Sequence, residues 1–566
     1  MLKNVRAAGF IAIVLLVSLI QSAFPLTTGR QQQPQRERRV TAPAASPTPT
    51  PVPSPMPAAS PSPSPTASPS ASPTPATKTS NPTATVAELQ SRISEILRKP
   101  QLAPAMIGIK VASLDTGRVI FEENAHKLLR PASNMKIYTV AAALDRLSPD
   151  YRFTTSVYAA AKPDAAGIIK GDLTLYGRGD PSIAARFNNG DYFKGINDLA
   201  ARIVAAGVKR VEGDLVGDET YFIGPPYGAG WEWEDLQWWY GAEVTSLTVN
   251  DNALDISIKP GPQVGSAAVV TTGPPDPLLN IINRVKTAPK GTRRDVSAYR
   301  GLASDEIEVS GTIAVDDRGY SGGLGISRPA LLFAYLLRAS LAQQGVIING
   351  KTRTTGPLIS TSSVINAPPV SSLVEVASLQ SPPLGLIAAQ TMKPSQNLYT
   401  ELLLRTLGKV APLATTAPGA DDTSESMGIK VLRTFLSEAG VNPASLALSD
   451  GSGLSRNDMI TPEATLQLLT YMRKHRYATA FRDSLPIAGV DGTLRNRMKG
   501  TVAENNVRAK TGTLSSASSL SGFVTTAAGE ELVFSIMVNN YPRDASPVSA
   551  CIDPIAVLLA SFTGRS

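Results

Sequence analysis

The chain has 566 residues, which is more than one hydrophobic core usually supports, so at least two folded units are expected. Its single cysteine, Cys551, excludes an internal disulfide and a cysteine-based metal cluster. Residues 1–85 carry +6 of the net charge of +8, so the rest of the chain is nearly neutral and its basic balance does not argue for nucleic-acid binding.

The first 25 residues have the pattern of a secretory signal. Two basic residues precede an unbroken apolar run from Ala7 to Ile20, which is short for a membrane span. A cleavage site after Ala23 would place Gln21 where a small residue is preferred. Both a cleaved signal peptide and an uncleaved signal anchor therefore stay open.

Residues 26–85 are predicted to be a disordered linker. Between Thr41 and Pro82, 14 prolines lie among serine, threonine and alanine without an aromatic residue. Such a segment buries too little apolar surface to offset its ordering entropy. We expect an exported protein of the periplasm or cell envelope, close to the membrane through its N-terminus and anchored to the inner membrane if the signal is not cleaved.

Folded sequence begins near residue 86. Residues 86–99 have helical periodicity, and residues 106–124 predict two short strands around an Asp-Thr-Gly turn. Residues 130–147 predict a loop that leads into an apolar helix. The loop before this helix contains the first candidate catalytic residues.

A change of pattern separates the middle of the chain from its ends. Residues 151–327 predict short strands broken by glycine, and helices return at residues 329–345, 395–408 and 425–440. The C-terminal part predicts strands at 506–514, 518–527 and 531–540, followed by a last helix at 547–562. The predicted fold is α+β, with a core from residues 86–150 and 328–566 and an inserted β-rich unit at 151–327.

Ser133 and Lys136 are the first candidate catalytic pair. They lie three positions apart at the predicted start of a helix, so their side chains project from the same face. A helix N-terminus also offers unpaired N–H groups to a developing oxyanion. A lysine acts as a base only when it is neutral, which requires burial or a nearby cation. Alone, Ser-x-x-Lys is a weak signal.

Two later elements give this pair partners. Ser395-Gln396-Asn397 opens a predicted helix, and Lys510-Thr511-Gly512-Thr513 lies on a predicted strand. A second hydroxyl and an amide can position a peptide and carry a proton. A strand lysine adds positive charge, threonine hydroxyls can hold a carboxylate, and glycine lets a substrate backbone approach. The three elements occur in the order that penicillin-recognising serine enzymes share.

The two histidines contribute little to this chemistry. His126 and His475 lie in polar stretches without metal-ligand spacing, and both are predicted to be surface residues. A lysine is therefore the natural candidate for the base of a hydrolase. No metal and no cofactor are expected.

From about residue 86 to its end, the chain resembles the class C low-molecular-mass penicillin-binding proteins, the D-Ala-D-Ala carboxypeptidase/endopeptidase family. The resemblance rests on RPASNMK, LYGRGDPS, MKPSQNLYTELLLR, GVDGTLRNRM and RAKTGTL, and above all on DGSGLSR at residues 450–456. Ser133 and Ser395 are 262 positions apart, and this gap resembles the large insertion of this family. The resemblance implies a penicillin-binding, serine β-lactamase-like transpeptidase domain, with an antiparallel sheet flanked by helices, an all-helical subdomain and this insertion.

The resemblance also implies roles. Ser133 would be acylated, with Lys136 as its general base, and Ser395 would carry a proton to the leaving amine. Asn397 would bind the substrate amide, and Lys510 would tune the electrostatics. The hydroxyls of Thr511 and Thr513 would hold the terminal carboxylate, and Gly512 would lie beside the substrate backbone. The backbone N–H groups of Ser133 and Thr513 would form the oxyanion hole. Peptidoglycan stem peptides would be substrates, and β-lactam antibiotics covalent inhibitors.

Two features stand apart from this assignment. Gln396 replaces the aspartate that the family usually has, which removes a negative charge near the two lysines and should ease the lowering of the Lys136 pKa. Four tryptophans fall within nine residues of the insertion and could stack on glycan strands or pack a loop: Trp231, Trp233, Trp238 and Trp239.

Two other functions remain possible from the sequence. A β-lactamase or esterase could use the same scaffold, although no deacylating glutamate or tyrosine is evident and the insertion is large. A wall-binding or penicillin-sensing module with vestigial machinery is the non-enzymatic alternative. The presence of Ser133, Lys136, Asn397 and Lys510 favours an enzyme over that module.

Overall fold

The computed structural model describes residues 83–566 except 275, 303, 360–367, 412–418, 420–421 and 543–544. The predicted signal segment and nearly all of the predicted linker lie outside the described residues. No helix among the described residues is long and apolar enough to cross a membrane.

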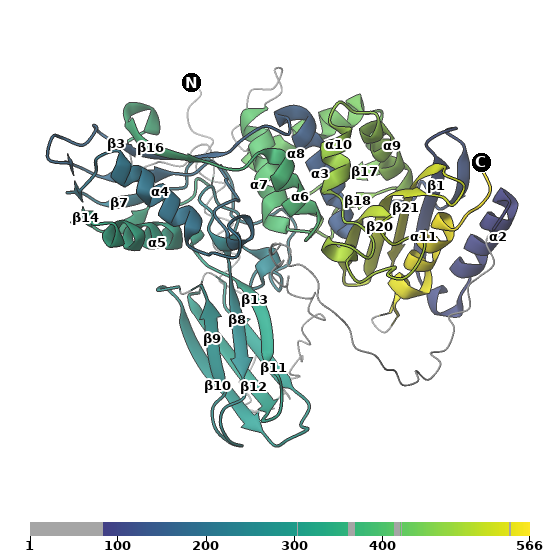
Figure 1. The fold of residues 1–566 in the computed structure, drawn as a ribbon, viewed down its shortest axis with the longest axis horizontal. Coiled ribbons are helices and arrows are strands. Elements are labelled where there is room, and N and C mark those ends of the chain that lie inside the picture. Colours follow the sequence, from purple (N-terminus) through teal and green to yellow (C-terminus); the bar gives the residue numbers. More distant parts are fainter. Residues whose placement is uncertain are drawn as a thin grey trace, which may run out of the picture. The chain divides into compact units, whose positions relative to one another are not determined.

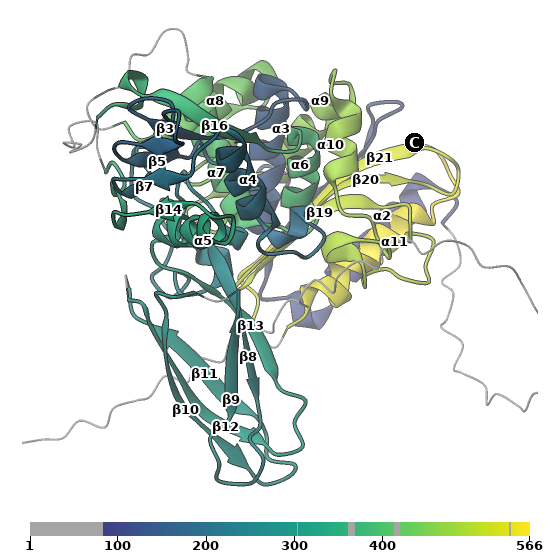
Figure 2. The same ribbon diagram turned by 60° about the vertical axis from the view of Figure 1, so that its left-hand side comes forward.

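A five-stranded antiparallel sheet forms the frame of the first unit. Its strand order is β19 (Arg508–Leu514), β20 (Ala517–Thr525), β21 (Glu531–Asn539), β1 (Met106–Ser113) and β2 (Val119–Glu123). Helices α2 (Val86–Leu97) and α11 (Asp553–Ala560) lie side by side along it (Figures 1 and 2). The predicted first helix and the predicted C-terminal strands are thereby confirmed.

Strand β21 shows that both faces of this sheet are covered. Leu532, Phe534 and Ile536 belong to the core that includes α2 and α11, whereas Val533 and Met537 belong to a second, mainly helical core. Successive side chains of a strand point to opposite faces, so two cores meet across one strand. This explains why the strand is apolar almost throughout.

The mainly helical core surrounds α3 (Met135–Leu147). Residues Met135 to Asp145 of this helix are all buried, as expected for a helix that is enclosed by protein. Two short strands contribute to this core, β17 (Leu446–Ala447) and β18 (Met459–Ile460). Five further helices surround α3: α6 (Leu384–Met392), α7 (Asn397–Val410), α8 (Ser424–Glu438), α9 (Pro462–Arg473) and α10 (Ala478–Ser484). Figure 1 shows α3 among α6, α7, α8 and α10.

The residues between β3 and β16 build a separate core. One sheet has the order β15 (Thr352–Thr354), β7 (Leu215–Asp218), β5 (Leu173–Tyr176), β3 (Thr154–Ala159) and β16 (Val374–Gln380). A small sheet of β14 (Ile347–Ile348), β6 (Arg210–Val211) and β4 (Ile168–Ile169) accompanies it. Helices α4 (Lys194–Ala205) and α5 (Pro329–Gln343) pack against each other in the same core.

Two three-stranded sheets complete this core. One has the order β13 (Tyr320–Gly325), β8 (Ala253–Lys259) and β9 (Val269–Gly273), and the other β10 (Asn280–Ala288), β12 (Glu306–Ala314) and β11 (Asp295–Arg300). Apolar residues of β8, β10 and β12 share one cluster with those of β3 and α5. Helix α4 was not predicted, because only strands were expected for residues 151–327.

Candidate active site

Ser133 and Lys136 meet at the start of the buried helix α3. Ser133 lies in a 3₁₀ turn, Ala132–Asn134, which runs directly into the helix, and Lys136 is the second helical residue. The Lys136 Nζ atom lies 3.0 Å from the Ser133 Oγ atom. Ser133 is half-buried, whereas Lys136 is fully buried. The pair is therefore within range for direct proton transfer.

Two further oxygen atoms fix the Lys136 amine. It donates to Asn397 Oδ1 at 2.5 Å and to the Ser452 carbonyl at 2.8 Å. A neutral amine has two N–H donors and one lone pair, so these two acceptors leave the lone pair directed at Ser133. The geometry suits a neutral lysine that accepts the proton of the serine hydroxyl.

Burial of the Lys136 side chain favours its neutral form. Loss of hydration lowers the pKa of Lys136 to about 7, although the carboxylates of Asp450, Glu401 and Asp458 oppose the shift. The pKa of Lys510 lies well below its ordinary value, mainly because the side chain is buried and secondarily because Lys136 is a nearby positive charge. Two buried amines near each other disfavour the state in which both are charged.

Asp450 orders the loop that presents the Ser452 carbonyl. Its carboxylate accepts hydrogen bonds from the N–H groups of residues 452–455, from the Ser452 hydroxyl and from Trp231 Nε1. The DGSGLSR stretch carried the family resemblance, but the sequence did not reveal that its backbone binds the Lys136 amine. Its contact with Lys136 joins residues that are 316 positions apart.

Gly453 lets this loop reach the turn that carries Ser133. Its φ angle is +78°, and a Cβ atom at this position would lie 1.9 Å from the carbonyl oxygen of Ala132. Gly453→Ala is expected to lower the free energy of unfolding by about 3 kcal/mol or more, because backbone strain and a backbone clash add up. It should also slow penicillin acylation at least about tenfold, because the Ser133 turn must move.

Gly440→Ala is the control for this prediction. Gly440 has a similar φ of +79° and no neighbouring atom within 4 Å of its Cβ position. It should lose only about 1–2 kcal/mol and keep the wild-type acylation rate. Chemical denaturation and stopped-flow labelling measure both quantities. Equal effects of the two substitutions would contradict the clash with Ala132.

Ser395 and Lys510 form a second hydroxyl–amine pair. Lys510 Nζ donates to Ser395 Oγ at 2.9 Å and to the Thr511 carbonyl at 2.8 Å. Ser395 has a φ angle of +66°, an uncommon conformation for a residue with a Cβ atom. Strained backbone of this kind clusters at functional sites.

Asn397 connects the second motif with the insertion. It is the first residue of α7, and its Nδ2 atom donates to the Tyr240 carbonyl at 2.8 Å while its Oδ1 atom accepts from Lys136. The remaining N–H of the amide is left for a substrate carbonyl. The direct contact between Asn397 and Lys136 was not foreseen from the sequence.

Gln396 caps α7, and its side-chain hydrogen bond among the described residues is to the helix and not to either lysine. Its Oε1 atom accepts from the Leu398 N–H at 3.1 Å, whereas its buried Nε2 atom has no hydrogen-bond partner among the described residues. An aspartate could make the same cap with a shorter side chain. The substitution thus keeps the cap and removes a charge.

Strand β19 lies against the turn that carries Ser133. A Cβ atom on Gly512 would lie 2.2 Å from Ser519 Oγ and 2.4 Å from the carbonyl oxygen of Pro131, so only glycine allows this approach. Thr511 is buried, and Thr513 is exposed at the end of the strand. All sequence-predicted site residues therefore lie in the 3₁₀ turn Ala132–Asn134, on α3, in the residues that lead into α7 and at its first residue, and on β19.

Other residues singled out from the sequence are explained by packing. The His475 side chain is only 5% exposed, which corrects the predicted surface position: it contacts Asp145 at 3.0 Å and lies between Tyr471 and Tyr477. His126 is exposed. Trp231 binds Asp450, Trp238 packs against the core of the insertion and Trp239 contacts Tyr240, so loop packing accounts for three of the four tryptophans; Trp233 is exposed.

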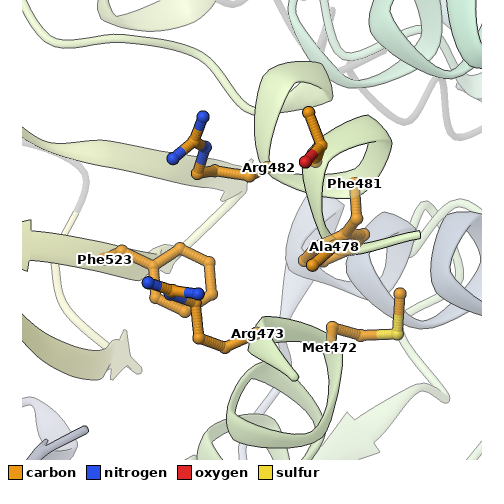
Figure 3. Close-up of a pocket in the computed structure, with 7 residues that line it drawn as sticks. Met472, Arg473, Ala478, Phe481, Arg482 and Phe523 are labelled. Carbon is orange, nitrogen blue, oxygen red and sulfur yellow. The ribbon is translucent and has the colours of Figure 1, made fainter. Parts of the chain in front are cut away.

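A small cavity of about 50 Å³ lies elsewhere, between α9, α10 and β20. Figure 3 shows Arg473 and Arg482 beside Phe523 at this place. Both arginines have carboxylate partners, Glu531 and Asp483. None of the predicted site residues lines this cavity.

Comparison with known proteins gives a family and relatives for this chain. Residues 89–562 match the D-Ala-D-Ala carboxypeptidase 3 (S13) family. A D-alanyl-D-alanine carboxypeptidase of Actinomadura sp. (strain R39) is 34% identical over 85% of this chain and 86% of its own length, and D-alanyl-D-alanine carboxypeptidase DacB of Haemophilus influenzae is 25% identical over 77% and 85%. The crystal structure of penicillin-binding protein 4 (dacB) from Haemophilus influenzae has a TM-score of 0.68 and 22% identity over 82% of this chain and 97% of that chain. The likeness confirms the predicted fold class.

Proposed function

Since the chain belongs to the D-Ala-D-Ala carboxypeptidase 3 (S13) family, we propose that Ser133 is its acylated nucleophile and Lys136 the general base. The protein is a serine-type D-Ala-D-Ala carboxypeptidase that binds penicillin. The observation that carries the residue assignment is the Lys136 amine, 3.0 Å from Ser133 Oγ and held by two other acceptors.

Acylation follows from this geometry. Neutral Lys136 takes the proton of the Ser133 hydroxyl as Oγ attacks the carbonyl carbon of the penultimate D-alanine of a peptidoglycan stem peptide. The backbone N–H groups of Ser133 and Thr513 stabilise the oxyanion, and Asn397 Nδ2 holds the substrate carbonyl. When the tetrahedral intermediate collapses, the peptide C–N bond breaks.

The second hydroxyl–amine pair completes the cycle. Ser395, bound to Lys510, passes a proton to the leaving amine, and the hydroxyls of Thr511 and Thr513 hold the terminal carboxylate. Lys136 gives the proton that it took from Ser133 to Ser395, which restores both groups. Water then attacks the ester of Ser133: neutral Lys136 takes one proton of this water and returns it to Ser133 Oγ as the ester bond breaks. A cross-linked strand in place of the leaving D-alanine makes the same site a DD-endopeptidase.

Domain organisation and location complete the proposal. The predicted insertion, residues 151–327, supplies the Tyr240 carbonyl to Asn397. Because α5, β14 and β16 share its core and β15 pairs with its strand β7, we propose that it extends to about residue 380. The protein would act on the cell wall in the envelope or periplasm, and the N-terminal segment would hold it near the membrane.

Labelled penicillin tests this proposal directly. The protein should form one covalent adduct, which peptide mass spectrometry should locate on Ser133, and it should release D-alanine from a pentapeptide that ends in D-Ala-D-Ala. Absence of both the adduct and the release would overturn the proposal. An adduct without release would favour a penicillin-sensing module, and rapid penicillin turnover would favour a β-lactamase.

A further inference from the structure

A short segment, Asp491-Gly492-Thr493, connects the second and third motifs of the site. The Thr493 N–H donates to the Lys393 carbonyl at 3.0 Å, and the Asp491 carboxylate forms an ion pair with the Lys393 side chain. Lys393 lies two residues before Ser395 in the chain. The other Asp491 oxygen accepts from the Ile487 N–H at 2.9 Å, which closes the segment on itself. We call residues 491–493 the strap.

Gly492 allows the strap to lie this close. Its φ angle is +56°, and a Cβ atom here would be 2.5 Å from the carbonyl oxygen of Lys393. The strap is thus fixed against the chain that leads to Ser395 by a backbone hydrogen bond, an ion pair and a close backbone approach.

The other side of the strap contacts strand β19. Thr493 Oγ1 lies 2.7 Å from Thr511 Oγ1, so the two hydroxyls share a hydrogen bond. Each hydroxyl has one hydrogen, and the bond between them uses one of the two. One O–H donor is left over in the pair. Thr493 is exposed, whereas Thr511 is 6% exposed and lies next to Lys510.

We propose that Thr493 is a positioning residue for the terminal carboxylate of the substrate, acting through the Thr511 hydroxyl, and that the strap sets the distance between this carboxylate site and Ser395. The inference rests on the proposed function, in which Thr511 and Thr513 hold that carboxylate. The left-over O–H of the pair is the donor to a carboxylate oxygen, and the bond from Thr493 orients it. A leaving group without a terminal negative charge gains little from this orientation.

Thr493→Val removes the hydroxyl and keeps the shape of the side chain. For a peptide that ends in D-Ala-D-Ala, KM should rise about tenfold with kcat within about threefold of the wild-type value, as expected for one hydrogen bond to a charged group. For the same peptide ending in D-alaninamide, the single-turnover rate with enzyme in excess should change less than about twofold. Thr493→Ser keeps the hydroxyl and should restore KM to within about threefold.

Thr526→Val is the matched control. Thr526 is a buried threonine in the turn after β20, and its hydroxyl accepts from the Glu530 N–H at 3.1 Å. Its replacement should leave both substrates unaffected. Equal losses with the carboxylate and amide peptides in Thr493→Val, or no rescue by serine, would overturn the role of Thr493. The proposed function would survive that result as long as Ser133 is still labelled by penicillin.

Discussion

Ser133→Ala is expected to abolish covalent labelling by penicillin and to lower kcat/KM for a D-Ala-D-Ala pentapeptide by about 10⁴-fold or more. The reason is that the Ser133 hydroxyl lies 3.0 Å from Lys136 Nζ at the start of α3, where it can lose its proton to the amine as it attacks the substrate. Without this oxygen no ester can form, and the oxyanion-binding groups have no intermediate to stabilise. Intact-protein mass spectrometry and an assay of released D-alanine measure the two effects.

A folded Ser133→Ala protein is needed for this conclusion. The serine is half-buried and its hydroxyl contacts Lys136, so its loss should change the free energy of unfolding by no more than about 1 kcal/mol. Ser340→Ala is a control, because it removes a buried hydroxyl that bonds Asn197 in the other core and should leave labelling unchanged. Stoichiometric labelling of Ser133→Ala would assign the nucleophile elsewhere, with Ser395 as the next candidate.

Local patterns predicted most of the elements around the site. The apolar run after Ser133 predicted the helix that became α3, and the alternating strands near the C-terminus predicted β19, β20 and β21. These elements are specified by residues that are neighbours in the chain. Helix α4 was not foreseen, because its apolar residues occur in a region whose glycines and short apolar runs favour strands.

Contacts between residues far apart in the chain could not be predicted from these local patterns. His475 lies in a polar stretch, yet Asp145 and two tyrosines enclose it, and these contacts depend on how α3 and α9 pack. In the same way, the position of α5 after residue 327 predicted that it belongs to the catalytic part, whereas its buried residues share one apolar cluster with those of β3 and β8. Which of two cores accepts a helix is decided by tertiary contacts rather than by periodicity.

In the candidate site, too, local spacing could be predicted and long-range contacts could not. Spacing placed Lys136 beside Ser133, and the order of the motifs predicted Ser395, Asn397 and Lys510 as partners. The groups that hold Lys136 could not be read in this way: the Ser452 carbonyl is a backbone atom 316 positions away, oriented by the hydrogen bonds of Asp450. A backbone acceptor leaves no signature of its own in a sequence, although the DGSGLSR stretch marked the place.

Lys136→Met is expected to lower the acylation rate by about 10²- to 10⁴-fold and to remove its dependence on pH near neutrality. In the wild-type protein the rate should rise with pH and level off above about 7, because burial lowers the pKa of Lys136 to about 7 and only the neutral amine accepts the Ser133 proton. Lys136→Ala should lose acylation in the same way. Stopped-flow labelling between pH 5 and pH 9, as rough limits that bracket this pKa, gives the profile.

The stability of the fold provides an independent reading of the same pKa. The lysine keeps its ordinary pKa of 10.5 in the unfolded chain, so between about pH 7 and pH 10.5 the unfolded state binds more protons than the folded state. This lysine therefore makes the fold more stable as pH rises through that window, and Lys136→Met should remove that contribution.

Lys110→Met is the control: Lys110 is also buried, but its ion pairs with Glu122 and Glu463 raise its pKa, so its loss should reduce stability and leave the acylation profile unchanged. An unaltered ascending limb in Lys136→Met would exclude Lys136 as the base and would shift attention to Lys510, the other buried amine of the site.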